Sequence, residues 1–167
     1  MKEKLGGGDL RSIGKANQIV DEVSNQGDFD ALFNHLYDND RLVVMRAADA
    51  IEKVTLSHPE YLLSHKDKVI SFCLQATNIE FKWHLALLVS RLPLSPEEEK
   101  NMFELLKQWA GNPKESKIVR VNAIQSLFTL SERNNALKSE LLSLVELLEA
   151  ENVPSICARL RKLKNSL

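Results

Sequence analysis

The sequence has few of the residues that mark a secreted, membrane or metal-binding protein. Its two cysteines, Cys73 and Cys157, fall within apolar helical patterns and lack the paired spacing of a zinc site. We therefore expect reduced thiols. The longest uninterrupted apolar run, Leu85–Val89, is far shorter than the roughly 20 residues that span a bilayer. Residues 1–8 also lack the apolar stretch of a secretory signal, so we expect a cytoplasmic protein with no membrane contact.

The sequence also lacks an excess of charge of either sign. Among 167 residues, 22 lysines and arginines face 23 aspartates and glutamates, which excludes the strongly basic balance of a nucleic-acid coat. An apolar fraction of 44% and a charged fraction of 27% are typical of a folded globular protein. We expect a flexible lead at residues 1–8, with Gly6–Gly8, followed by one domain at 9–167. A phosphate-binding glycine loop is the alternative for these glycines, but no strand precedes them and no Lys-Ser/Thr follows.

Catalytic and metal-binding motifs are missing as well. The sequence contains neither a Gly-x-Ser-x-Gly elbow nor a Cys-x-x-Cys or His-x-x-x-His pair. His58 and His65 lie at the opening of one expected helix and should be exposed, whereas His84 should lie at the edge of a packed helix. The sequence therefore predicts no enzyme activity, no cofactor and no metal. The four scattered histidines are His35, His58, His65 and His84.

A repeat of 38 residues is the main feature that is present. Three segments that begin at Asp40, Asn78 and Ser116 share apolar positions with helical spacing. Each first residue belongs to the class that caps helix starts, so we expect a helix to begin next to each one. The aligned apolar columns are Val43, Phe81 and Val119; Ala47, Leu85 and Ala123; Ile51, Val89 and Leu127; and Val54, Leu92 and Leu130.

The stretches between these segments are helical too, which makes the unit a helix pair. Ser57-His-Pro-Glu60 and Ser95-Pro-Glu-Glu98 have the pattern of capping boxes with proline in the first turn. A fourth pair follows, with Pro154 opening its second helix, and one unpaired helix runs from Leu10 to Val23. We predict about nine helices and no strand. The expected pairs are 28–56, 58–92, 95–131 and 135–167.

One of these segments resembles a known family. Val119-Arg-Val-Asn-Ala-Ile-Gln-Ser-Leu127 is similar to the second-helix signature of HEAT repeats, and Val43–Ile51 is a second match. The resemblance implies an all-α fold, an α-solenoid of about four HEAT-like helix pairs plus one N-terminal helix. HEAT families often carry an Asp six residues before the signature Arg. Here Lys114 stands in that place before Arg120, so side-by-side apolar packing is expected to hold the stack together.

Similar HEAT arrays serve mostly as scaffolds that bind proteins or peptides. A minority resemble the AlkD-type DNA glycosylases, which clasp a duplex in their concavity. The resemblance therefore implies a protein-binding scaffold, with a nucleic-acid-binding HEAT protein as the alternative.

An apolar strip on the second helices is the candidate binding surface. At 100° per residue, Met45, Trp83 and Val121 fall almost opposite the aligned core columns, and Leu87 and Phe128 lie on the same side. Tryptophan is a common anchor at interfaces. The alternative interpretation is that these residues contact the next repeat.

Basic residues border this strip. Lys82 and Arg120 share one column, Arg91 lies one turn further on, and the basic end of the last helix complements its own dipole or meets phosphates. We therefore predict a non-enzymatic scaffold that binds a partner helix or peptide on the concave, second-helix face. The predicted binding residues are Met45, Trp83, Leu87, Val121, Phe128, Lys82, Arg120 and Arg91.

Overall fold

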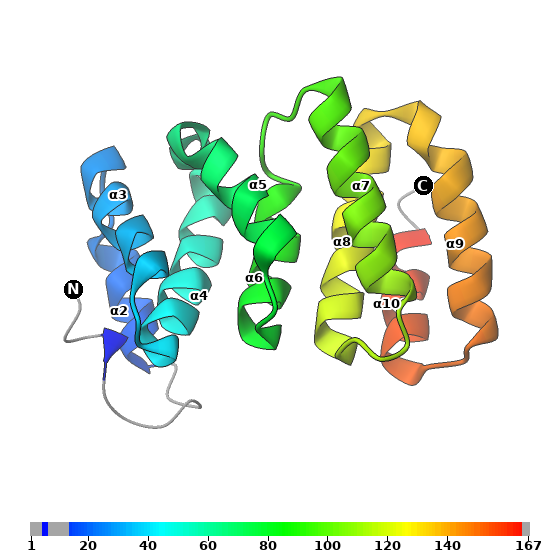
Figure 1. Ribbon diagram of the computed structural model, residues 1–167, viewed down its shortest axis with the longest axis horizontal. Helices are drawn as coiled ribbons and strands as arrows, with labels where there is room; N and C mark the ends of the chain where they lie inside the picture. Colours follow the sequence, from blue (N-terminus) through cyan, green and yellow to red (C-terminus); the bar gives the residue numbers. More distant parts are fainter. Residues whose placement is uncertain (1–4, 7–13, 165–167) are drawn as a thin grey trace. The chain divides into compact units, whose positions relative to one another are not determined.

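The structure, a computed structural model, describes residues 5–6 and 14–164 (Figure 1). In this part of the chain there are nine α-helices, three short 3₁₀ helices and no strand. The all-α fold class predicted from the sequence is therefore confirmed. The chain divides into two compact units, Met1–Lys66 and Asp67–Leu167, which are described one at a time.

The first unit is built around α4, which packs against α2, α3 and both 3₁₀ helices of the unit. Phe29, Phe33 and Ile51 are fully buried in its core. Leu5 is buried too, and its carbonyl oxygen accepts a hydrogen bond from Arg46 Nη1 at 2.9 Å. The helices are α2 (Gly14–Glu22), α3 (Gln26–Asn34), η1 (His35–Tyr37), α4 (Arg41–Ser57) and η2 (Pro59–His65).

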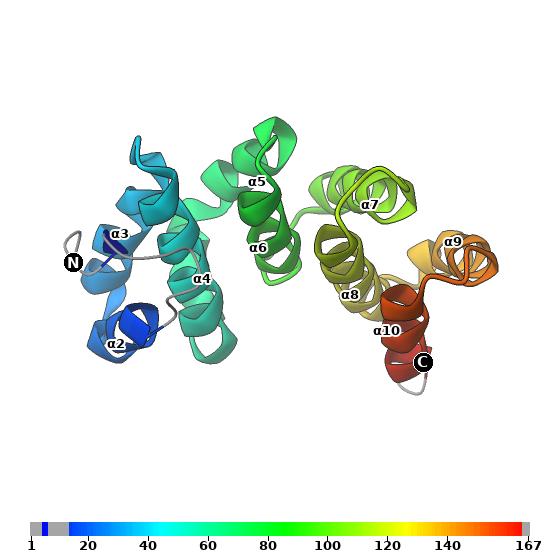
Figure 2. The ribbon, with the colours of Figure 1, turned by 90° about the horizontal axis from the view of Figure 1, so that it is seen from below.

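The second unit is built around α8, which packs against α6, α7, α9 and α10. Figure 2 shows α8 and α10 beside each other, with α7 and α9 above them in this view. Each helix pair therefore contributes one helix to each layer of this unit. The helices are α5 (Lys66–Gln75), α6 (Ile79–Val89), α7 (Pro96–Gly111), α8 (Lys117–Arg133), η3 (Asn135–Leu137), α9 (Lys138–Ala150) and α10 (Pro154–Lys164).

The predicted helix starts are confirmed. The side chains of Asp40, Asn78 and Ser116 each accept a hydrogen bond from a backbone N–H in the first turn of α4, α6 and α8. Such a bond satisfies one of the amides that a helix start leaves without a partner. Pro154 opens α10, and Ser95 forms the expected capping box with Glu98.

The capping box predicted at Ser57 is wrong. Ser57 is the last residue of α4, and the next helix begins as the 3₁₀ helix η2, whose N-cap His58 makes no side-chain cap bond. Glu60 instead accepts from His58, whose Nδ1 lies 3.0 Å from Glu60 Oε1. The proline tolerated in a first helical turn thus starts a 3₁₀ turn here, with the α-helix following from Lys66.

The prediction for His65 is also wrong, whereas His58 is exposed as expected. His65 is 6% exposed, because its ring stacks on Phe33 with 3.9 Å between the ring centroids. Its Nε2 lies 2.6 Å from Asp30 Oδ1.

The side chain of His84, a residue of α6, is buried. Of the N-terminal helix predicted from Leu10 to Val23, Leu10 lies outside the described residues, and Val23 is buried just after α2, which ends at Glu22.

Hydrogen bonds from buried side chains, as well as apolar packing, join the helices of the second unit. Ser126 Oγ donates to the carbonyl of Ala86 at 2.5 Å, which ties α8 to α6. Arg120 Nε donates to the carbonyl of Ala110 at 2.7 Å, which ties α8 to α7. The expectation of purely apolar contacts therefore needs correction: buried polar side chains bridge neighbouring helices and find partners there.

Candidate protein-binding surface

Helix α6 presents an apolar stripe on its outer side. Ile79, Trp83 and Leu87 follow one another at a spacing of four residues, which places them on one face of a helix. Ile79 is 46% exposed, and Trp83 and Leu87 are partly exposed. The opposite side of α6, with Leu85 and Leu88, is fully buried. We call Ile79, Trp83 and Leu87 the α6 stripe. It keeps contact with solvent although its residue types favour burial.

Polar side chains from α8 and α10 continue this surface. Asn122 Nδ2 on α8 donates to the carbonyl of Trp83 at 2.9 Å, so the side chain of Asn122 lies against α6 beside the stripe. Further along α8, Gln125 Oε1 accepts from Arg159 Nη1 of α10 at 2.6 Å. The second helices of this unit thus combine one apolar stripe with amide and guanidinium groups, an arrangement typical of an apolar interface core with a polar rim.

The structure divides the predicted binding residues into accessible and buried groups. Trp83, Leu87, Val121 and Arg91 are partly exposed in the second unit, and Met45 is partly exposed on α4 of the first.

Two of the predicted residues need correction, because Phe128 is 1% and Arg120 is 3% exposed. Phe128 contributes to the core of the second unit, and Arg120 extends inward towards α7. Neither side chain is available to a partner on this surface.

Two of the three cations predicted at the rim, Lys82 and Arg120, form ion pairs inside the unit. Lys82 forms an ion pair with Glu115, and their side chains are only 12% and 11% exposed. Its Nζ also lies 4.8 Å from the ring centroid of Trp109, within cation–π range.

Arg120 likewise forms an ion pair, with the carboxylate of Glu151. Its Nη2 lies 2.7 Å from Glu151 Oε2. Each cation sits in the first turns of a second helix, and each partner lies just before the next second helix. These two ion pairs, Lys82–Glu115 and Arg120–Glu151, are called the forward pairs.

Two accessible isoleucines at the starts of α6 and α8, Ile79 and Ile118, are not among the residues predicted from the sequence. Ile118 is 45% exposed in the first turn of α8. Both follow a capping residue, at positions outside the aligned core columns. An isoleucine in an exposed first turn is a signal that the sequence carried, because such positions favour polar or acidic residues.

The described residues offer little for catalysis. Among them, no group of three or more His, Cys, Asp or Glu side chains is placed to hold a metal ion. Burial raises the pKa of the Cys73 thiol to about 12, so this thiol stays protonated and unreactive at neutral pH. Cys157 is also a free thiol. No helix in the described ranges is long and apolar enough to span a bilayer.

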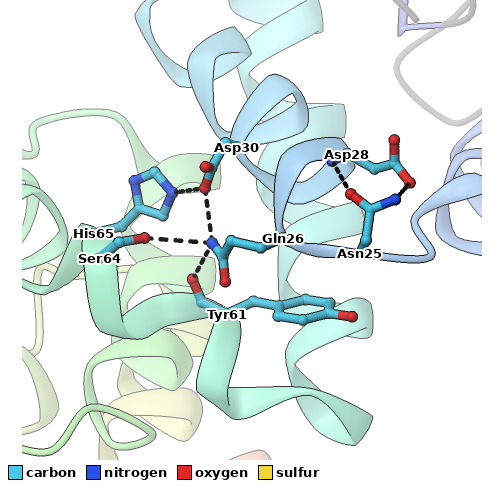
Figure 3. Close-up of polar contacts among 7 residues, drawn as sticks. All are labelled: Asn25, Gln26, Asp28, Asp30, Tyr61, Ser64 and His65. Carbon is cyan, nitrogen blue, oxygen red and sulfur yellow. Dashed lines mark hydrogen bonds and ion pairs between the residues drawn. The ribbon is translucent and has the colours of Figure 1, made fainter.

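A polar network in the first unit has a structural explanation. Figure 3 shows Gln26 and His65 meeting at Asp30, whose Oδ1 lies 2.7 Å from Gln26 Nε2 and 2.6 Å from His65 Nε2. Gln26 Nε2 also donates to the carbonyl of Tyr61 at 3.1 Å. The network fastens η2 to α3, and its residues are held by one another, so we assign it to the fold and not to a binding site.

Comparison with known proteins agrees with this architecture. No curated protein and no solved structure matches the chain. A family model described as a HEAT repeat domain matches residues 3–166, which is almost the whole chain. The signature segment around Arg120 and the succession of helix pairs agree with this match. The chain belongs to the HEAT repeat domain family.

Proposed function

We propose that this protein is a non-enzymatic scaffold that binds a helix or peptide of a partner protein on its second-helix surface. HEAT repeats generally mediate interactions between proteins, and this proposal adds a face and an anchor. The observation that carries it is the α6 stripe, in which Ile79, Trp83 and Leu87 meet solvent on one side of a helix. Trp83 is the expected anchor, because tryptophan buries a large area at interfaces.

The surroundings of the stripe set the chemistry of the partner. Asn122 and Gln125 offer amide groups beside the apolar residues, and both are held by hydrogen bonds to neighbouring helices. A partner helix with an apolar face and polar edges would bury the stripe and keep its own edges hydrogen-bonded. Val121, Arg91 and Met45 remain predicted contacts, and the cytoplasmic location predicted from the sequence belongs to this proposal.

Nucleic-acid binding receives less support than protein binding. The alternative relied on Lys82, Arg120, Arg91 and the basic end of the last helix as phosphate contacts. Lys82 is largely buried with Glu115, and Arg120 is buried and paired with Glu151, so a phosphate at either of these two cations would have to displace a carboxylate. Several accessible cations on one face are the usual requirement for backbone binding.

The proposal is tested by comparing which proteins the wild-type chain and two variants retain. Trp83→Ala removes the expected anchor, and Leu142→Ala removes a leucine that is 51% exposed on α9, outside the proposed surface. A partner bound through the α6 stripe is retained by wild type and Leu142→Ala and lost with Trp83→Ala. The same partner, purified, should bind Trp83→Ala at least about tenfold more weakly in a titration.

Circular dichroism of both variants shows whether each one still folds. Equal retention by all three folded proteins would contradict the proposed anchor. An Ile79→Ala variant provides a second probe of the stripe with a smaller change at its exposed end.

A further inference from the structure

A second surface lies on the opposite layer of the second unit, between α5 and α7. Here the structure has a groove of about 390 Å³ with an apolar floor and an acidic border. Ile70 and Leu74 come from α5, Met102 and Leu105 come from α7, and the carboxylates of Glu98 and Glu104 stand at the border. Grooves of this size with a few charged groups are typical of ligand and peptide sites.

The apolar wall of the groove is open to solvent. Leu74 is 65% exposed, whereas Met102 at the floor is 2% exposed. Ile70 precedes Leu74 by one helical turn, so the two side chains form one ridge along α5. Covering this ridge would remove apolar area from water at roughly 25 cal/mol per Å². The groove therefore has both a cavity for an anchor and an exposed edge that gains from being covered.

The two charged residues that line the groove, Glu98 and Glu104, are both acidic. No lysine or arginine is among the described residues that line it. On α7, Lys100 and Lys107 are displaced by about 140° and about 160° from Leu105 at 100° per residue, so they start from the other side of the helix. On α5, Lys66 and Asp67 both lie about one turn before Ile70, so this end of the groove side carries one charge of each sign.

Neighbouring cations reduce this negative charge only in part. Lys107 Nζ lies 2.8 Å from Glu104 Oε1 and 2.6 Å from Glu140 Oε2, so a single ammonium group is shared by two carboxylates. Glu98 accepts a hydrogen bond from the backbone N–H of Ser95 at 2.7 Å, within the capping box at the start of α7. The border therefore retains net negative charge next to an apolar floor.

We propose that this groove binds a basic amphipathic segment of another protein, with apolar side chains on Ile70, Leu74, Met102 and Leu105 and with lysines or arginines facing Glu98 and Glu104. Electrostatic complementarity selects a cationic partner and speeds its encounter, while the apolar floor supplies most of the affinity. The proposal concerns a different layer from the α6 stripe and does not depend on the function proposed for that stripe.

The experiment uses the full chain and a synthetic, fluorescein-labelled peptide of leucines and lysines at helical spacing. Fluorescence anisotropy should show binding that weakens as salt rises, and a matched peptide with glutamate in place of lysine should bind at least about tenfold more weakly. Leu74→Ala should weaken binding of the basic peptide by about fivefold or more, equivalent to about 1 kcal/mol. Its matched control is Leu147→Ala, which removes a leucine that is 68% exposed on α9 and should leave binding unchanged.

A second pair of variants separates charge from apolar contact. Glu104→Gln should weaken binding and reduce its dependence on salt, whereas Glu146→Gln, at an exposed position of α9, should change neither. Because Leu74 and Glu104 lie at the surface, both variants are expected to fold, and thermal melting checks this.

Three results would overturn the proposal. One is equal binding of the basic peptide by Leu74→Ala and Leu147→Ala. Another is loss of this binding in Trp83→Ala, which would move the peptide to the second-helix surface and support the function proposed for it. The third is self-association in sedimentation equilibrium that Leu74→Ala abolishes, because a second copy would then be the occupant.

Discussion

Helices α6 and α8 have the same place in successive repeats but different outer sides. Both start next to a capping residue, and both carry a cation in the first turns that pairs with an acid before the next second helix. Their outer sides differ, because α6 carries Trp83 and Leu87 in the stripe, whereas α8 carries Val121 and Gln125 at the corresponding positions. The repeat thus specifies caps, core and braces, while the outer side varies from one helix to the next.

The difference between the outer sides of α6 and α8 indicates which residues are candidates for binding. Residues that recur at a step of 38 serve the packing of the stack, since every copy must bury the same face against its neighbours. A residue that departs from its counterparts is free of that requirement. Trp83 is such a residue, because a tryptophan stands where the other copies have Met45 and Val121.

The largest expected effect is at the shared core. Leu127 is fully buried in α8, and its replacement by alanine should lower the free energy of unfolding by about 2–5 kcal/mol. Urea denaturation measures this change. Ile118→Ala, at an exposed position of the same helix, is the control and should change stability by no more than about 0.5 kcal/mol. An unchanged midpoint for Leu127→Ala would contradict the register.

A smaller effect is expected at the forward pairs. Arg120→Ala leaves the Ala110 carbonyl and the Glu151 carboxylate without their partner, and should cost about 1–3 kcal/mol of stability. Glu151→Gln keeps a hydrogen-bond acceptor for Arg120 and should cost less. Equal stability of Arg120→Ala and wild type in urea would show that this pair does not brace the unit.

The solvent exposure of the two tryptophans, Trp83 and Trp109, can be compared by fluorescence. Trp109 is 7% exposed, and Trp83 is more exposed than that. With Trp109→Phe, the remaining emission comes from Trp83 and should be partly quenched by iodide. With Trp83→Phe, the emission of Trp109 should be shifted to the blue and better shielded. Complete shielding of Trp83 in the monomer would place it in the core and remove the anchor from the proposed surface.

The smallest effect concerns an exposed pair in the other layer. The hydrogen bond from Lys107 holds the pKa of Glu140 below its usual value of 4.5. Since the folded-state pKa is the lower one, this contribution is present above pH 4.5 and is lost as the pH falls through the lowered pKa.

Glu140→Gln should therefore reduce stability at neutral pH by less than about 1 kcal/mol and make the acid-side loss less steep. Glu115→Gln, in the largely buried pair with Lys82, should cost more. Urea denaturation at neutral and acidic pH measures both variants. An identical pH dependence for Glu140→Gln and wild type would contradict this assignment.

The helix caps and the apolar core columns could be predicted from the sequence because they depend on residues that are close together in the chain. Caps such as Asn78 act on amides two or three residues away, and core columns such as that of Leu127 follow the helical period. The 3₁₀ geometry of η2 is not predicted from local signals, and its last residue, His65, contacts Phe33 and Asp30, which are far away in sequence.

The candidate binding surface could be predicted only in part, because contacts between helices that are distant in sequence decide which side chains are exposed. Helical angle places Trp83 and Phe128 on one side, yet only Phe128 is fully buried, because the neighbours of each helix decide how wide an arc is covered. The forward pairs are not predicted from the sequence, because the HEAT pattern places the acid six residues before the cation, whereas Glu115 and Glu151 follow their cations by 33 and 31 residues.

The forward pairs also constrain how such a chain can change length. Glu151 is followed by Asn152, whose positive φ of 53° turns the backbone between α9 and α10 in a conformation that asparagine adopts more readily than most residues. An inserted or deleted residue here would carry the Glu151 carboxylate away from the Arg120 guanidinium, and the same holds for Glu115 in the α7–α8 connector. In descendants of this chain, these two connectors should therefore keep their length even where their residues diverge.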